Sequence, residues 1–245
     1  MKPGTVVRIV VLVLLVAFLV TPQSFAFVFA PLTQNGQPAI YTQNSLLNLT
    51  LSHIGLVVAA TLVATLVAVG LAILVTRPSG AEFLPLSRMI ANTGQTFPPV
   101  AVLALAVPIL GFGSGPTLVA LFLYGLLPIF ENALTGLTTI APDIEDSARG
   151  TGMSETQRLW QVELPLALPL ILAGIRLSVT ISIGTATIGS TVAASTLGEA
   201  IIAGLINSNL AFVAQGGLVV GVLAILSYDG LRALERRFAR RVGAR

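Results

Sequence analysis

Long apolar runs separated by short polar segments form the pattern of this chain. A helix needs about 20 apolar residues to cross a bilayer, and six runs approach or reach that length. The predicted spans cover residues 9–29, 53–75, 89–111, 117–130, 168–188 and 210–226. The fourth span is short unless it extends to Ala133, and Pro98, Pro99 and Pro108 interrupt the third. The pattern predicts an all-α polytopic membrane protein with about six transmembrane helices.

The first run allows two interpretations. Lys2 and Arg8 precede apolar residues 9–20, and the run continues less cleanly to Phe29. It is either a retained transmembrane helix or a signal peptide with a small-x-small cleavage site near Ala26. We favour the helix, because apolar residues resume at Phe25. Both interpretations place the residues that follow outside the membrane, as a polar, uncharged loop.

The connecting segments differ sharply in charge. Cytoplasmic segments of membrane proteins are enriched in lysine and arginine. The basic residues expected inside are Lys2, Arg8, Arg77, Arg88, Arg149, Arg158 and the six arginines of residues 232–245. The alternate segments carry none, so both chain ends are predicted to be cytoplasmic. Residues 190–209, with Glu199 their only charge, are expected to form an external or re-entrant segment.

The pattern and the charges together predict a simple organisation. The expected parts are an N-terminal transmembrane helix (1–30), an external loop (31–52), a membrane core (53–229) and a basic cytoplasmic tail (230–245).

Composition narrows the class of protein. The chain is 55% hydrophobic and 9% charged, whereas soluble domains are about 25% charged. A nucleic-acid partner is not expected, because six of the thirteen basic residues lie in the tail beside an apolar run. There is no cysteine and a single histidine, His53. We therefore expect no disulfide, no metal site, no cofactor and no histidine base.

Residues 142–165, here called the charged segment, stand out from the apolar chain. They hold seven of its 23 charged side chains. Asp143 is placed to cap a short helix over residues 144–149. Gly150 and Gly152 would then allow the positive φ angles of a tight break.

A second short helix is predicted after this break. Ser154 and Gln157 have the spacing of a capping box, which starts a helix. Pro165 is expected to end that helix, because the residue before a proline avoids the α conformation. The charged segment is thus predicted to be an amphipathic helix–turn–helix, suited to a groove on a partner. Trp160 is expected to contact that partner or the inner membrane surface.

The spacing within the charged segment resembles the EAA loop of permease subunits of bacterial binding-protein-dependent ABC importers. That family has Glu-Ala-Ala, three residues, Gly, nine residues, an aliphatic residue, one residue and Leu-Pro. The matching positions here are Asp146, Ser147, Ala148, Gly152, Val162, Leu164 and Pro165. Aspartate replaces the family's glutamate, and serine replaces its first alanine. The resemblance implies that these positions, apart from the serine, couple the chain to an ATPase.

Further motifs are similar to the osmoprotectant branch of these permeases, which imports glycine betaine, choline and related quaternary ammonium compounds. They are residues 95–99 (QTFPP), 121–128 (LFLYGLLP), 162–176 (VELPLALPLILAGIR) and 183–187 (IGTAT). Residues 76–83 and 94–107 also resemble a betaine permease whose system carries two different permease subunits. The resemblance covers about residues 53–229 and implies the type I ABC importer permease fold.

The resemblance also implies a set of partners. Two permease subunits, identical or related, would enclose a pathway in the bacterial cytoplasmic membrane. Two cytoplasmic ATPase subunits would drive it, and an external solute-binding protein would deliver the solute. The chain has no GxxxxGK[ST] phosphate-binding loop, so we expect it not to be an enzyme and ATP to be hydrolysed by a partner.

Polar residues in or beside the spans are candidates for the solute pathway. They are Asn92, Gln95, Thr96, Tyr124, Thr185, Thr187, Ser190 and Thr191. The alternative is that they join helices, as serine and threonine often do in membranes. Aromatic faces hold quaternary ammonium groups, a role open to Tyr124 and Phe97.

Two further residues have alternative interpretations. Arg176, inside the fifth span, is either functional or structural. A structural Arg176 would snorkel to the cytoplasmic interface or pair with Glu131. His53 is expected to be an interface residue at the outer start of the second span rather than a proton relay.

Three other functions compete with an osmoprotectant permease. A permease for a different solute, such as an amino acid or a sulfonate, stays open because the pore residues do not name their ligand. A secondary transporter is disfavoured, because its spans would need acidic groups and only Glu131 lies at the edge of one. An intramembrane enzyme is disfavoured by the absence of HExxH, a Ser/His pair or paired intramembrane aspartates.

Overall fold

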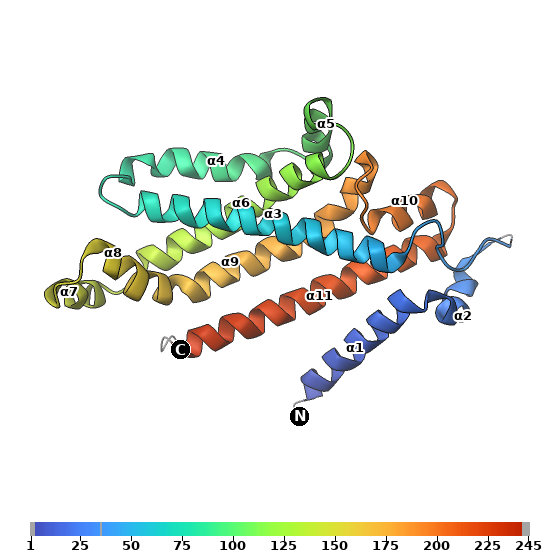
Figure 1. Ribbon diagram of the computed structural model, residues 1–245, viewed down its shortest axis with the longest axis horizontal. Helices are drawn as coiled ribbons and strands as arrows, with labels where there is room; N and C mark the ends of the chain where they lie inside the picture. Colours follow the sequence, from blue (N-terminus) through green and yellow to red (C-terminus); the bar gives the residue numbers. More distant parts are fainter. Residues whose placement is uncertain (1–2, 35, 242–245) are drawn as a thin grey trace. The chain divides into compact units, whose positions relative to one another are not determined.

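The computed structural model describes residues 3–34 and 36–241, whose regular elements are all helices (Figure 1). Lys2 and the last four residues of the tail lie outside the described part. The α-helices are α1 Pro3–Val20, α2 Ala26–Phe29, α3 Leu46–Val75, α4 Leu84–Thr96, α5 Pro99–Leu110, α6 Ser114–Thr138, α7 Pro142–Gly150, α8 Glu155–Arg158, α9 Leu164–Thr185, α10 Gly198–Ile206 and α11 Leu210–Arg241. Shorter turns are η1 Pro22–Phe25, η2 Ala30–Leu32, η3 Ala81–Phe83, η4 Leu159–Glu163 and η5 Ala186–Val192.

The chain forms two compact units. Unit 1 comprises residues 1–59, 98–121 and 182–227, and unit 2 comprises residues 60–97, 122–181 and 228–245. Helices α3, α6, α9 and α11 each contribute residues to both units.

Long apolar helices confirm the predicted membrane class. Four are long and apolar enough to cross a bilayer, namely Leu46–Val75, Ser114–Thr138, Glu155–Val192 and Leu210–Arg240. Two broken helix pairs, Thr5–Val20 with Pro22–Leu32 and Ala81–Thr96 with Pro99–Leu110, raise the number to six if each pair is one span. The fourth span extends past Ala133, and the third breaks at Pro98 while Pro108 stays inside α5.

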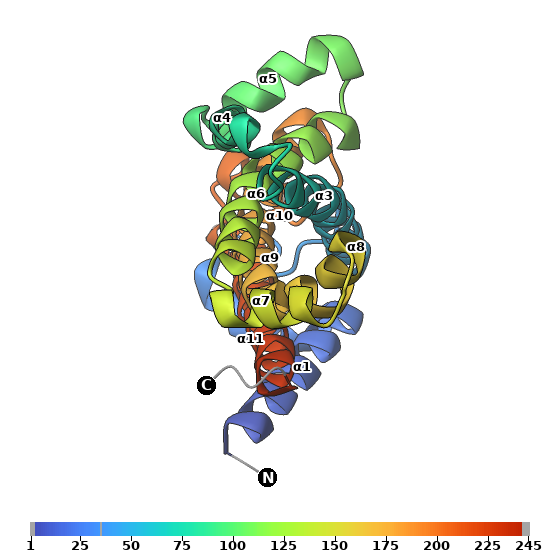
Figure 2. The same ribbon diagram turned by 90° about the vertical axis from the view of Figure 1, so that its left-hand side faces the viewer.

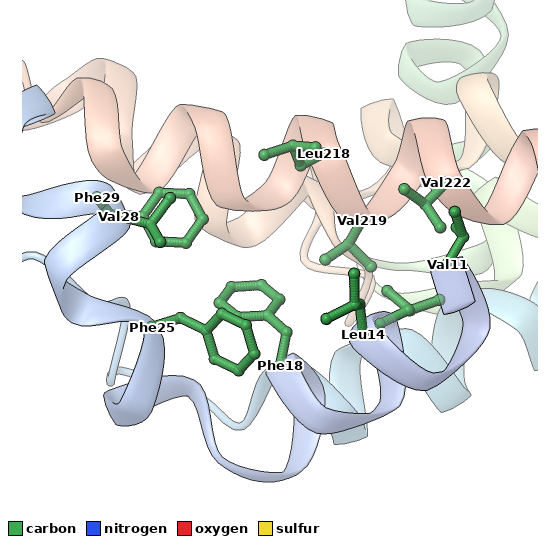
Figure 3. A pocket seen from close by; sticks show the side chains of 10 residues that line it. Val11, Leu14, Phe18, Phe25, Val28, Phe29, Leu218, Val219 and Val222 are labelled. Atoms are coloured by element: carbon green, nitrogen blue, oxygen red, sulfur yellow. The ribbon is translucent and has the colours of Figure 1, made fainter. Parts of the chain in front are cut away.

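The first apolar run bends instead of continuing straight to Phe29. Helix α1 ends at Val20, and the segment starting at Pro22 leaves it at an angle of 114°, because proline cannot continue a helix. The bend brings the rings of Phe25 and Phe29 to 5.4 Å from that of Phe18. These rings line an apolar cavity of about 300 Å³ together with residues of α11. Figure 3 shows the lining side chains.

Two buried amides of unit 1 hold the loop that precedes α3. Gln215 of α11 donates from Nε2 to the carbonyl of Ala39 (2.8 Å) and accepts the N–H of Tyr41 (3.1 Å). Asn209 donates to the carbonyl of Pro38 (3.0 Å). Its Oδ1 accepts the N–H of Ala211 (3.0 Å) and so caps α11. The loop is thereby tied to α11 by paired buried polar groups.

The core of unit 2 is built from small residues facing large ones. Ala64, Ala68 and Ala72 follow one face of α3 at a spacing of four residues and are fully buried. Their cluster includes Phe130 of α6. A Cβ at Gly94 of α4 would lie 2.2 Å from the carbonyl oxygen of Leu123. Only glycine therefore allows α4 and α6 to approach so closely.

Candidate functional site

The turn between α7 and α8 determines the geometry of the charged segment. Gly152 has a φ of +83°, in the region where glycine is favoured. Its N–H donates to Arg149 O (2.9 Å), and the N–H of Met153 donates to Ala148 O (3.3 Å). These two bonds form a Schellman C-cap. The predicted break at Gly152 is confirmed, whereas Gly150 is an ordinary residue of helix α7.

The N-terminal caps predicted for the two helices of the charged segment are confirmed only in part. Asp143 does not cap α7, because the helix begins at Pro142, a residue pre-organised for that position. Asp143 lies in the first turn, where an acidic group interacts favourably with the helix dipole. The capping box of α8 is confirmed. Ser154 Oγ accepts the N–H of Gln157 (3.3 Å), and Gln157 Oε1 accepts the N–H of Ser154 (2.8 Å).

The prediction that Pro165 ends the second helix is wrong. Helix α8 continues through η4, a π-helical turn, into α9, which begins at Leu164. The N–H of Leu164 bonds the carbonyl of Leu159, five residues back. We attribute the continuity to this wider turn, which accommodates a proline that has no N–H to donate. The second half of the charged segment is therefore one helical path with the span, Glu155–Val192. Figure 2 shows α7 and α8 as adjacent short helices.

The matched motif positions fall into two groups by burial. Ala148 is buried, Val162 and Pro165 are half-buried, and Leu164 packs against the core of unit 2. Asp146 and Gly152 are exposed. Two apolar side chains of the segment are also exposed, Ile144 by 41% and Trp160 by 67%. The expected contact of Trp160 with a partner or the membrane stays a prediction.

A buried ion pair joins the charged segment to the end of α3. Glu163, in the π-turn, is 8% exposed. Arg77, just after α3, donates from Nη1 to Glu163 Oε1 (3.2 Å) and from Nη2 to Oε2. The hydrogen bonds to Glu163 raise the pKa of Arg77 above its usual range. A bidentate pair of this kind fixes both position and orientation.

A polar cavity of about 380 Å³ lies beside this ion pair. Its charged lining residues are Arg77, Glu145, Arg149, Glu155, Arg158 and Glu163. Three cations thus face three anions. The EAA-loop spacing did not single out Arg77 or Glu163, because neither is one of its matched positions. The sequence did hold one signal for this pair. Arg77 follows the end of α3 and Glu163 directly precedes α9, so two opposite charges lie at the ends of two spans.

Four candidate pathway residues lie in unit 2. Gln95 Nε2 donates to the backbone carbonyl of Tyr124 (2.9 Å), and the Tyr124 hydroxyl donates to the carbonyl of Phe97. Thr96 bonds the carbonyl of Thr93 on its own helix (2.8 Å). Asn92 is exposed. The contacts of Gln95 and Tyr124 connect α4 to α6 where the third span breaks.

The other four candidates lie in unit 1, around the end of α9. Thr187 and Thr191 each bond a carbonyl three residues back, both at 2.7 Å. Ser190 Oγ lies 2.7 Å from Thr196 Oγ1, and Thr185 is half-buried. The structure thus places the eight residues in two groups.

Arg176 has a structural partner that the sequence did not indicate. Its Nε donates to Glu235 of α11 (3.0 Å), and its guanidinium lies 4.6 Å from the ring centroid of Tyr228. The predicted pairing with Glu131 is wrong, because Glu131 pairs with Arg88 (3.1 Å).

His53 is not an interface residue, since its side chain is fully buried in unit 1. Its Nε2 lies 3.0 Å from the carbonyl oxygen of Ile183. Because a carbonyl only accepts, Nε2 carries the proton. Nδ1 is buried without a partner.

Among the described residues, no group of three histidine, cysteine or acidic side chains could hold a metal ion.

Comparison with known proteins identifies the family. Residues 68–240 match the family described as "Binding-protein-dependent transport system inner membrane component". The chain is 39% identical over 197 residues to the osmoprotectant import permease protein OsmY of Salmonella typhimurium, covering 80% of this chain and 84% of that protein. It is 38% identical over 192 residues to the choline transport system permease protein OpuBB of Bacillus subtilis, covering 78% and 88%.

A third relative and a solved structure extend the comparison. The glycine betaine/carnitine/choline transport system permease protein OpuCB of Bacillus subtilis is 37% identical over 182 residues, covering 71% of this chain and 82% of that protein. A structure of the MetNI methionine ABC transporter, described as inward facing, aligns with a TM-score of 0.65 at 20% identity. It covers 80% of this chain and 95% of that one, and it confirms the type I ABC importer permease fold. The chain is therefore a multi-pass inner membrane component of a binding-protein-dependent ABC transport system and belongs to that permease family.

Proposed function

We propose that this chain is the transmembrane pathway subunit of an ATP-driven importer for glycine betaine, choline or a related quaternary ammonium compound. The observation that supports this solute class is identity of 37–39% to permeases named for these solutes or for osmoprotectants. A permease for an amino acid or a sulfonate is the alternative. The methionine transporter supports only the fold, because its identity is 20%.

We infer that the charged segment receives the motion of a cytoplasmic ATPase. The segment exposes the apolar side chains of Ile144 and Trp160 and the acidic side chain of Asp146, a combination suited to a groove on a partner. Gly152 and Ala148 maintain the turn between the two helices. Val162, Leu164 and Pro165 join that turn to α9.

Two connections would carry this motion into the membrane helices. The first is the helical path from α8 through η4 into α9, which has no loop between the charged segment and the span and so would act as a lever. The second is the pair Arg77–Glu163, which ties the π-turn to the end of α3. A rigid connection is required, since a flexible joint would absorb the motion.

The remaining partners and the orientation follow from the same proposal. Both chain ends lie in the cytoplasm, and an external solute-binding protein delivers the solute to the opposite side. A second permease subunit, identical or related, completes the pathway. Asn92, Gln95, Thr96, Tyr124, Thr185, Thr187, Ser190 and Thr191 are the proposed lining residues.

The decisive experiment compares two glycines of the charged segment. A Cβ would meet nothing within 4 Å at either Gly150 or Gly152, but only Gly152 has a positive φ. Gly152→Val should abolish uptake of radiolabelled glycine betaine by the complete system, because a β-branched residue disfavours this conformation by about 1–2 kcal/mol or more.

Gly150→Val is the matched control and should keep most of the uptake. Both variants should reach the membrane in normal amounts, measured by immunoblot of membrane fractions. Normal uptake by Gly152→Val at a normal protein level would refute the coupling role.

A further inference from the structure

A second polar cavity lies in unit 1, away from the charged segment in the sequence. Its volume is about 370 Å³, and it lies between α10, the end of η5 and the loop before α3. Its polar lining residues are Tyr41, Gln43, Ser190, Glu199 and Asn207. Only Ser190 among them was a candidate pathway residue.

Glu199 brings a negative charge to this cavity. It is the only acidic residue among the segments that form unit 1. It is half-buried, and its Oε2 accepts a hydrogen bond from Asn44 Nδ2 (3.2 Å). The described residues give it no basic partner within ion-pair distance. A half-buried carboxylate without a counter-charge attracts cations.

Tyr41 places an aromatic ring beside that carboxylate. Its backbone N–H is held by Gln215, and its ring packs edge-to-face on Phe212 at 5.4 Å. Burial raises the pKa of the Tyr41 hydroxyl, and the charge of Glu199 raises that pKa further. The phenol and the carboxylate line the same cavity, and the contacts with Phe212 and Gln215 fix the position of the ring.

We propose that this cavity is a subsite for an organic cation of the quaternary ammonium class. Such a cation has no N–H to donate, so a carboxylate and an aromatic ring are the groups that recognise it. A hard inorganic cation would instead need about six oxygen ligands, whereas this cavity offers a single carboxylate. The choice of ligand class rests on the proposed function; the charge and the ring are features of the cavity itself.

The subsite should distinguish choline from glycine betaine. Choline carries a net positive charge, whereas glycine betaine also carries a carboxylate, which Glu199 repels. The cavity should therefore favour choline at low solute concentration.

A labelling experiment tests binding without relying on transport. The purified complex in nanodiscs is treated with a water-soluble carbodiimide and glycine ethyl ester, which convert accessible carboxylates to amides. Mass spectrometry then measures labelling at Glu199 and, as an internal control, at exposed Glu82. Tetramethylammonium chloride should reduce labelling at Glu199 several-fold relative to sodium chloride at equal ionic strength, with no change at Glu82. Equal labelling at Glu199 in both salts would overturn the subsite.

A transport experiment tests the role of the charge. Glu199→Gln should lower choline uptake at sub-saturating concentration about five-fold, the effect expected of one solvated charge, and glycine betaine uptake much less. Asn44→Ala is the control, because it removes the hydrogen bond to Glu199 and keeps the charge. Equal losses for both solutes in both variants would show that Glu199 only holds the loop, which overturns the proposal.

The two proposals can fail separately. If tetramethylammonium protects Glu199 but the complex imports neither choline nor glycine betaine, the proposed solute is wrong and the subsite stands. If both solutes are imported while protection and the charge effect are absent, the subsite is wrong and the proposed function stands.

Discussion

Arg77 and Glu163 lie in an environment that differs from that of an ordinary surface charge. Their side chains are 21% and 10% exposed, whereas those of the pair Arg88–Glu131 are 53% and 40% exposed. Loss of the arginine charge should therefore affect stability differently in the two ion pairs. Removing one partner of a buried pair leaves an uncompensated charge, which costs about 3–5 kcal/mol. An exposed pair contributes about 0–1 kcal/mol.

Arg77→Gln should accordingly destabilise the protein and impair uptake, while Arg88→Gln should do neither. The measurements are thermal unfolding of the purified protein and uptake by the complete system. We expect Arg77→Gln to lower the free energy of unfolding by about 3 kcal/mol, the lower end of the range for a buried pair, because Arg77 keeps some exposure. The double variant Arg77→Glu with Glu163→Arg should recover part of the stability. Equal effects of Arg77→Gln and Arg88→Gln would contradict the assigned role of the buried pair.

At the scale of elements, the π-turn η4 sets the angular position of α8 relative to α9. A π-turn contains one more residue than an α-helical turn. Removing one residue would restore α-helical bonding and rotate the preceding helix by about 100°. The faces of α7 and α8 would then point in a new direction while α9 stays unchanged.

Deletion of Gln161, an exposed residue of η4, should therefore abolish uptake without preventing membrane insertion. The substitution Gln161→Ala keeps the residue count and should leave uptake close to normal. Radiolabelled solute uptake and membrane immunoblots provide the two readouts. Normal uptake by the deletion variant would mean that the orientation of α8 is unimportant for coupling.

At the scale of the whole molecule, orientation across the membrane is the property that connects the two proposed sites. The proposed function requires that the charged segment face the cytoplasmic ATPase and that the cavity at Glu199 be open to the external solute-binding protein. The absence of native cysteine makes this directly testable, because any introduced cysteine is unique.

A membrane-impermeant maleimide should label Gln34→Cys in intact spheroplasts and label Thr156→Cys only after the membrane is broken. Both positions are exposed in this chain, so a difference in labelling before and after the membrane is broken reports the side on which each position lies. Labelling of Thr156→Cys in intact spheroplasts would reverse the proposed orientation and with it both site assignments.

The hydrophobic pattern and short-range sequence signals were sufficient to predict many features of this protein. Apolar runs indicated about six spans, because burial in lipid depends on length and hydropathy along the chain. The capping box at Ser154 and the positive φ at Gly152 were predictable, since both depend on residues a few positions apart. The family itself was recognisable from motif spacing.

Other features depended on residues distant in the sequence, and only the tertiary structure decided them. Arg77 and Glu163 are 86 residues apart, so no local pattern pairs them. The partner of Arg176, the burial of His53 and the cavity at Glu199 likewise depend on which helices pack together. The prediction that Pro165 ends a helix was wrong because the π-turn before it accommodates a residue without an N–H, and that turn is a property of the folded chain.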